Sequence, residues 1–203
     1  MHFDKIKNKG QGQLFEKEYL ESLTKSHPAI IYSMYLPLIL FLVYYSRAYL
    51  ELTWTSLILA FVAGVFTWTF VEYVLHRFVF HIISEKPNIQ RFIYKIHGVH
   101  HEYPRDQERL FMPPLPSIFL AAFFLGLFFL LMGEYAFAFF PGFVSGYLAY
   151  GSMHFAIHAF KPPFFMKSLW RNHHLHHYKY PDKGFGVSSV LWDYVFGTMP
   201  PQK

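Results

Sequence analysis

The chain has 203 residues, of which 53% are hydrophobic, 22% are aromatic and only 15% are Asp, Glu, Lys or Arg. A typical soluble domain has about 25% charged residues, so this composition excludes an ordinary soluble domain and a disordered chain. The sequence has no cysteine, which excludes disulfides, thiolate metal sites and iron–sulfur clusters. The 13 histidines then stand out, because histidine is the commonest metal ligand.

Residues 1–28 are polar and rich in lysine. They lack the apolar core of a cleavable signal peptide, so none is expected. We expect instead a helical arm at the membrane surface. Its apolar side would carry Leu14, Phe15, Tyr19, Leu20 and Leu23.

Four stretches are nearly free of charged residues, at about 29–46, 52–75, 113–133 and 135–160. A membrane helix needs about 20 apolar residues, and the first stretch, although shorter, tolerates Pro37 as a kink. The alternative of four buried core helices would leave too little chain to cover them. The predicted fold is therefore all-α, with residues 29–203 forming a membrane domain of four transmembrane helices and a helical cap at 76–112 and 161–203.

The basic residues predict the orientation. Of the 18 Lys and Arg, only Arg47 falls outside the arm and the two cap segments. Because cytoplasmic loops collect Lys and Arg, we expect both termini and the cap to be cytoplasmic, in a bacterial inner membrane or the endoplasmic reticulum. The net charge of +5 then reflects topology, and we expect no nucleic-acid partner.

Eleven histidines fall in four groups at or beyond the ends of the second and fourth spans, whereas His2 and His27 in the arm follow no pattern. The groups are His76 and His81; His97, His100 and His101; His154 and His158; and His173, His174, His176 and His177.

Spacings of three and four residues place side chains on one face of a helix. Each of the groups at 97–101 and 173–177 can therefore converge on a single point, with His174 pointing away. His76 and His81 are about 140° apart on a regular helix. They would need an irregular turn or would face two different metals.

Histidines at helix ends can simply cap carbonyls or contact lipid headgroups. However, ten of them on one membrane face would repel each other as cations and would be costly unpaired. Ten ligands suit two metal ions at about five each, and zinc usually takes only four, so iron is expected, with O₂ as co-substrate. Glu72 and Asp193 are candidates to accept the outer imidazole N–H. For Glu72, an ion pair with Arg77 or a contact with a lipid headgroup is an equal alternative.

Several motifs outside the histidines carry a family resemblance: Arg109-Leu-Phe-Met-Pro-Pro, Gly184-Phe-Gly-Val-Ser-Ser and Leu191-Trp-Asp-Tyr-Val-Phe-Gly-Thr. With His97-Gly-Val-His-His, they make residues 70–200 resemble the fatty acid hydroxylase (sterol desaturase-like) superfamily, and specifically its fatty acid 2-hydroxylase branch. The resemblance implies oxygen-dependent hydroxylation of C2 of a long acyl chain, commonly in sphingolipids, at two irons that zinc can displace during purification. It implies ten ligands: His76, His81, His97, His100, His101, His154, His158, His173, His176 and His177.

Eukaryotic members of this branch often carry an N-terminal cytochrome b5 domain, and the residues before the first span are too few to form one. We therefore expect a separate electron donor, either a cytochrome b5-like protein or a ferredoxin with its reductase. Candidates to line the acyl tunnel are Phe111, Met112, Phe164 and Met166. The alternative is that these residues face lipid.

Two alternatives remain. The same histidine pattern would serve a carotenoid or sterol hydroxylase, or a desaturase, of the same superfamily. A membrane metal-binding protein or transporter is more distant, because a transporter should place ionisable residues near the bilayer midplane. His154 and His158 lie instead at the end of a span.

Overall fold

The computed structural model describes residues 6–201, and His2 lies outside this range. Across these residues the chain is helical and has no strand, as predicted. The α-helices are α1 Glu18–Ser22, α2 Pro28–Ala48, α3 Trp54–Val74, α4 Pro87–Ile93, α5 Val99–Glu102, α6 Pro114–Met132, α7 Ala136–Ala159, α8 Lys167–Tyr178 and α9 Leu191–Val195. Two π-helices, η1 Leu75–Phe80 and η2 Tyr94–Gly98, and two 3₁₀ turns, η3 Gln107–Arg109 and η4 Gly133–Tyr135, complete the secondary structure.

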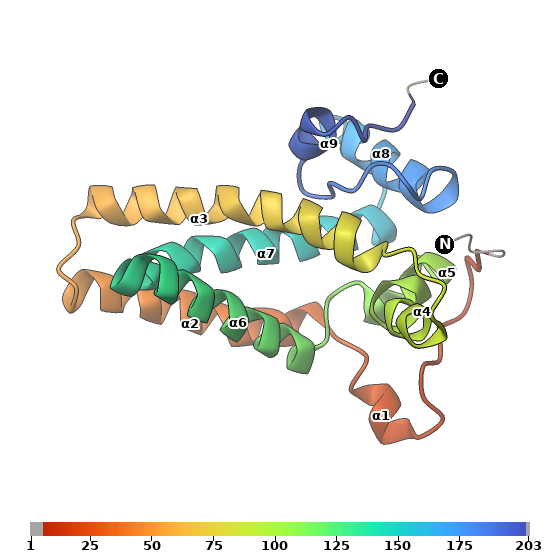
Figure 1. Ribbon diagram of the computed structural model, residues 1–203, viewed down its shortest axis with the longest axis horizontal. Helices are drawn as coiled ribbons and strands as arrows, with labels where there is room; N and C mark the ends of the chain where they lie inside the picture. Colours follow the sequence, from red (N-terminus) through yellow and green to blue (C-terminus); the bar gives the residue numbers. More distant parts are fainter. Residues whose placement is uncertain (1–5, 202–203) are drawn as a thin grey trace.

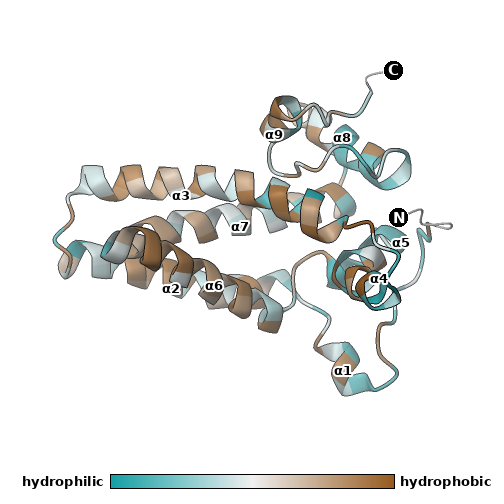
Figure 2. Ribbon diagram, viewed as in Figure 1, coloured by the Kyte–Doolittle hydropathy of each residue, from teal (hydrophilic) through white to brown (hydrophobic). Residues whose placement is uncertain are grey.

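Four long helices, α2, α3, α6 and α7, form an elongated bundle with the smaller elements gathered at one end (Figure 1). Three ranges are long and apolar enough to cross a membrane: Pro28–Ala48, Trp54–Phe80 and Gln107–Ala159. The last range contains both α6 and α7, which fold back on each other at Gly133 (Figure 1). Figure 2 shows the hydrophobic residues concentrated in the bundle and the hydrophilic residues at the end that carries the histidines. The chain is an integral membrane protein.

Local signals set the helix ends. Pro28 begins α2, where its missing N–H is not needed, and the preceding His27 accepts a hydrogen bond from the Ala29 N–H through Nδ1. The Thr53 hydroxyl accepts from the Ser56 N–H, 3.2 Å away, and so caps α3. Gly133 ends α6 with a φ of +59°, a conformation that favours glycine.

The closest helix pair in the bundle is α3 against α7. A Cβ on Gly142 would overlap the Phe61 carbonyl, and one on Gly64 would overlap the Phe139 carbonyl. Small residues of this kind let two membrane helices approach backbone to backbone. The crossing fixes the ends of α3 and α7, from which His76 and His154 reach the site.

The N-terminal arm differs from its prediction. Between residues 6 and 27 only the five residues of α1 are helical, and both Tyr19 on α1 and Leu23 just after it are exposed. The other residues of this range bind the loop after α5 through their main chain: the Gly12 N–H donates to the Asp106 carboxylate, and the Ser26 N–H donates to the Glu108 carbonyl.

Candidate metal centre

The π-helix η1 brings His76 and His81 together. Its hydrogen bonds run from residue i to i+5, so side chains five residues apart come to the same side, which a regular α-helix does not allow. The two imidazole centroids lie 5.1 Å apart. The irregular turn is therefore present, and both residues belong to the same group of histidines.

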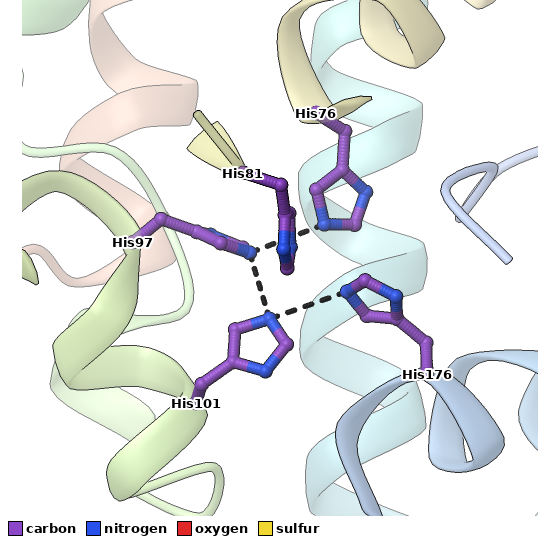
Figure 3. A group of neighbouring side chains, drawn as sticks. All are labelled: His76, His81, His97, His101 and His176. Carbon is purple, nitrogen blue, oxygen red and sulfur yellow. Dashed lines mark hydrogen bonds between the residues drawn. The ribbon is translucent and has the colours of Figure 1, made fainter. Parts of the chain in front are cut away.

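Five histidines form the first group, shown in Figure 3, and their ligand nitrogens all lie within 4.8 Å of one another. The group consists of His76, His81, His97, His101 and His176. The Nε2 atom of His97 lies 3.1 Å from that of His76 and 3.0 Å from that of His101. The Nε2 atoms of His101 and His176 are 3.2 Å apart.

The other five predicted ligands form a second group with the same spread of nitrogens: His100, His154, His158, His173 and His177. Here the Nε2 atoms of His100 and His154 are 2.8 Å apart. The Nε2 atom of His173 lies 2.9 Å from that of His158 and 3.1 Å from that of His177.

The partition corrects one prediction. The groups at 97–101 and 173–177 do not each converge on a single point. In each of these two segments, the two histidines spaced by four residues belong to the same group, and the third histidine belongs to the other group. His100 therefore lies in the second group and His176 in the first. The helices α5 and α8 therefore pass between the two groups and contribute to both. His174 belongs to neither group, and its Nδ1 donates to the Trp170 carbonyl within α8.

Main-chain carbonyls fix the orientation of three rings. The Nδ1–H groups of His76, His176 and His154 donate to the carbonyls of Phe185, Lys183 and Leu110, at 2.5, 2.8 and 2.9 Å. Because a carbonyl only accepts, Nδ1 carries the proton, and in the neutral ring Nε2 presents a lone pair to the group. Nothing in the side chains signals these acceptors, although all three residues lie in or beside the motifs of the family resemblance.

The donor set fits a cation. In the first group three Nε2–Nε2 contacts are available, but His76 and His176 bring no proton to them, so His97 and His101 can supply at most two. At least one of the three contacts is then left without a hydrogen bond, which a bound ion relieves. The separations also fit, because two nitrogens about 2.1 Å from one ion are about 3.0 Å apart at a right angle.

Burial keeps the ligands neutral. Removal from water, reinforced by the neighbouring imidazoles, lowers the pKa of six cap histidines well below the usual value: His97, His100, His101, His173, His176 and His177. At neutral pH these rings are therefore neutral, with one nitrogen free of a proton, which is the form that binds a metal.

Glu72 and Asp193 do not meet the imidazoles as predicted. In the hydrogen bonds described for residues 6–201, Glu72 accepts from the Val187 and Ser188 N–H groups, at 2.7 and 2.9 Å, and from the Ser188 hydroxyl. Asp193 accepts from the N–H groups of residues 185 and 186 and from the Thr198 hydroxyl. Both carboxylates thus hold the loop at 184–188, whose Phe185 carbonyl orients His76. Arg77, the predicted alternative partner of Glu72, donates to the Tyr73 hydroxyl instead.

The four tunnel candidates occupy different environments. Met112 lines an apolar cavity of about 20 Å³ with Trp68 and Tyr147, room for about one water molecule. Phe111 is buried against α7, beside Gly151. Phe164 is 83% exposed, and Met166 packs near Trp170 in a separate cluster. Only Met112 lines this cavity, and Trp68 connects it to the second group through Tyr150, whose ring stacks on His154.

Comparison with known proteins identifies relatives of the whole described chain. The family model described as fatty acid hydroxylase matches residues 61–198. The chain is 38% identical over 202 residues to ceramide very long chain fatty acid hydroxylase SCS7 of Saccharomyces cerevisiae, covering 98% of this chain and 52% of that protein. It is 38% identical over 192 residues to dihydroceramide fatty acyl 2-hydroxylase FAH2 of Arabidopsis thaliana, covering 93% and 80%.

Mammalian and structural matches agree. Fatty acid 2-hydroxylase of Mus musculus is 32% identical over 215 residues, covering 94% of this chain and 57% of that protein. A solved structure titled full length scs7p, with only the hydroxylase domain visible, superposes with a TM-score of 0.88 at 38% identity, covering 95% of this chain and 74% of that chain. The chain thus spans about half the length of the yeast and mouse proteins and most of the length of the plant protein.

Proposed function

The chain belongs to the fatty acid hydroxylase family, and from this membership we propose that it hydroxylates C2 of a long-chain fatty acyl group in sphingolipid metabolism. The observation that carries the proposal is the pair of five-histidine groups. It agrees with the names of the relatives, which are ceramide, dihydroceramide and fatty acid hydroxylases.

The membrane arrangement is part of the proposal. The helices α2, α3, α6 and α7 each cross the bilayer once, so residues 29–203 form one membrane domain and the turns near Arg47 and Gly133 lie on the far side. The cap faces the cytoplasm. The support is the fold-back of α6 onto α7 (Figure 1) and the Lys and Arg residues at the cap end.

Each histidine group would hold one metal ion, and we propose iron for both. Bound there, the pair of ions would supply O₂-dependent C–H hydroxylation with two electrons from a separate donor protein. Imidazole nitrogens alone do not choose between iron and zinc, but hydroxylation needs a redox-active metal, which zinc is not.

The chain's own residues would perform three tasks. The Phe185, Lys183 and Leu110 carbonyls hold three rings with Nε2 toward the ions. The buried setting of the histidines keeps water away from the reaction. Met112, Trp68 and Tyr147 line the apolar cavity, and Trp68 contacts Tyr150, whose ring stacks on His154. We propose that this cavity widens to admit the end of the acyl chain.

Mass spectrometry of hydrolysed lipids tests the function directly. Cells expressing the intact chain together with an electron donor should accumulate 2-hydroxy fatty acids. His100→Ala should lower this product by about 100-fold or more, because it removes a ligand from the second group. His174→Ala is the matched control: it changes a neighbouring histidine outside both groups and should retain most of the product.

The outcomes separate the alternatives. Metal-loaded protein that forms no 2-hydroxy fatty acid but modifies a carotenoid or sterol would overturn the acyl substrate and retain the metal centre. Equal loss of metal in His100→Ala and His174→Ala would contradict the ligand assignment itself.

A further inference from the structure

The helix α9 lies against the flank of a membrane span. The Trp192 ring on α9 is 4.8 Å from that of Phe70 and 5.7 Å from that of Phe66, and its Nε1–H donates to the Thr69 hydroxyl at 2.9 Å. These partners are on α3, four to eight residues before Val74, which at 1.5 Å per residue is about 6–12 Å inside the end of that helix. Figure 1 shows α9 beside α3.

The outer face of α9 is apolar and exposed. Tyr194 is 62% exposed and Val195 is 58% exposed, and Leu191 and Phe196 on either side are also exposed. This face continues the exposed apolar face of α3, on which Phe66 is 54% exposed. A large exposed apolar surface marks a contact with a partner or a membrane, and here it adjoins a surface that already faces lipid.

The segment carries no exposed charge. Between Lys183 and Lys203 the sequence has one charged residue, Asp193, and Asp193 is fully buried, accepting hydrogen bonds from the chain itself. Charged groups are what keep a surface helix out of the hydrocarbon region. Trp192 and Tyr194 are also the residue types that gather at membrane–water interfaces.

We propose that α9 is a lipid-facing anchor, with its outer face seated in the interfacial region of the bilayer beside α3. The sequence places this segment in a cytoplasmic cap, and the contacts to α3 move it to membrane depth. The bilayer is favoured as the occupant because this face adjoins the exposed apolar face of α3 and carries no exposed charge.

The anchor is connected to the first histidine group by two contacts in series. Asp193 on α9 binds the N–H groups of the loop at 185–186, and the Phe185 carbonyl in that loop accepts from His76. The contact of α9 with lipid therefore influences the position of His76 indirectly, through the loop at 185–186.

Site-directed fluorescence tests the anchor, and the absence of native cysteine means that a single introduced cysteine is labelled without background. Three variants, Val195→Cys, Val62→Cys and Asp182→Cys, carry an NBD fluorophore and are reconstituted in phosphatidylcholine vesicles. Val62 on α3 is the lipid reference, because it is also 58% exposed, and the exposed Asp182 is the aqueous reference.

Brominated phospholipids should quench the label at 195 at least half as strongly as the label at 62, and iodide in the buffer should quench it much less than the label at 182. Quenching at 195 that matches the aqueous reference would overturn the proposal. The proposal would also be overturned if neither quencher reached the label at 195 until the protein was diluted to fewer copies per vesicle. That result would identify a contact between copies of the chain. Tyr194→Cys repeats the measurement if Val195→Cys does not fold.

Discussion

At the scale of single residues, the two buried carboxylates act on the histidines through the loop at 184–188. Glu72 and Asp193 together accept hydrogen bonds from the main-chain N–H groups of residues 185 to 188. The loop in turn offers the Phe185 carbonyl to His76. A substitution of either carboxylate should therefore displace the Phe185 carbonyl and so change the orientation of His76.

Glu72→Gln should weaken metal binding by the first group roughly 10- to 100-fold, the usual effect of losing an outer partner of a ligand. Glutamine has one acceptor oxygen, so it can keep the Val187 and Ser188 N–H groups but replaces the oxygen that accepts from the Ser188 hydroxyl, and it removes the negative charge. Metal content measured during titration with a chelator should fall from two ions to one before the second is lost. Glu85→Gln, the same change at an exposed residue, is the control. Identical chelator curves for the two variants would contradict the coupling.

The gathering of these ten histidines at one end of the bundle could be predicted from the sequence, because their spacings repeat along helices. Their division into two groups could not, because a helix that passes between two sites presents different histidines to each side. The outer acceptors were missed for a related reason. Leu110, Lys183 and Phe185 act through the carbonyl that every residue carries, so no side chain reveals them.

At the scale of elements, the sequence predicts the long helices well. The predicted spans 29–46 and 135–160 correspond to α2 at Pro28–Ala48 and α7 at Ala136–Ala159, because charged residues, prolines and glycines mark their ends. The π-helix η1 was signalled only by the spacing of His76 and His81. Its sequence, Leu-His-Arg-Phe-Val-Phe, contains nothing that disfavours a regular α-helix, so the extra residue in the turn comes from packing at the site.

Gly142→Ala should destabilise the bundle, because the new Cβ would overlap the Phe61 carbonyl at the α3–α7 crossing and forced overpacking costs about 1–3 kcal/mol. The expected result is a lower midpoint of thermal unfolding in detergent. Gly126→Ala on α6 is the control, since a Cβ there meets nothing within 4 Å and alanine favours a helix over glycine by about 1 kcal/mol. An unfolding midpoint of Gly142→Ala that does not fall below that of the intact chain would show that the crossing tolerates a methyl group.

At the scale of the whole molecule, the N-terminal arm is hydrogen-bonded to the segment that follows three of the ten histidines, His97, His100 and His101. Lys7 donates through its N–H to the Glu102 carbonyl at 2.7 Å, just after His101 on α5. Arg109 donates to the Gly12 carbonyl at 2.7 Å and also pairs with Glu21. The loop that carries Leu110 is therefore held between the arm and the bundle.

Glu21→Gln should loosen the arm, whereas Glu108→Gln should have little effect. Burial would raise the pKa of Glu21, but the Leu14 and Phe15 N–H groups and the Arg109 guanidinium outweigh it and hold the pKa below the usual value. A depressed carboxyl pKa stabilises the fold at neutral pH, and this contribution is lost as the pH falls through the lowered value. Losing a hydrogen-bonded charge of this kind costs about 1.5–3 kcal/mol.

Limited proteolysis measures the difference. Trypsin should cleave after Lys17 faster in Glu21→Gln than in the intact chain, because cleavage follows the population of the opened arm. Glu108 is half exposed and forms an ion pair with Lys25. An exposed ion pair of this kind contributes about 0–1 kcal/mol to stability. Both variants make the same chemical change and leave every trypsin site in place, so equal rates would show that the buried pair does not hold the arm.

The carbonyls that orient His76, His154 and His176 have a consequence for protein engineering. A main-chain oxygen is not encoded by any codon, so no conventional substitution at 110, 183 or 185 can delete the acceptor, and random mutagenesis leaves it intact. Changing the basicity of these imidazoles requires atomic replacement, such as an ester in place of the amide, introduced by chemical synthesis or an expanded genetic code.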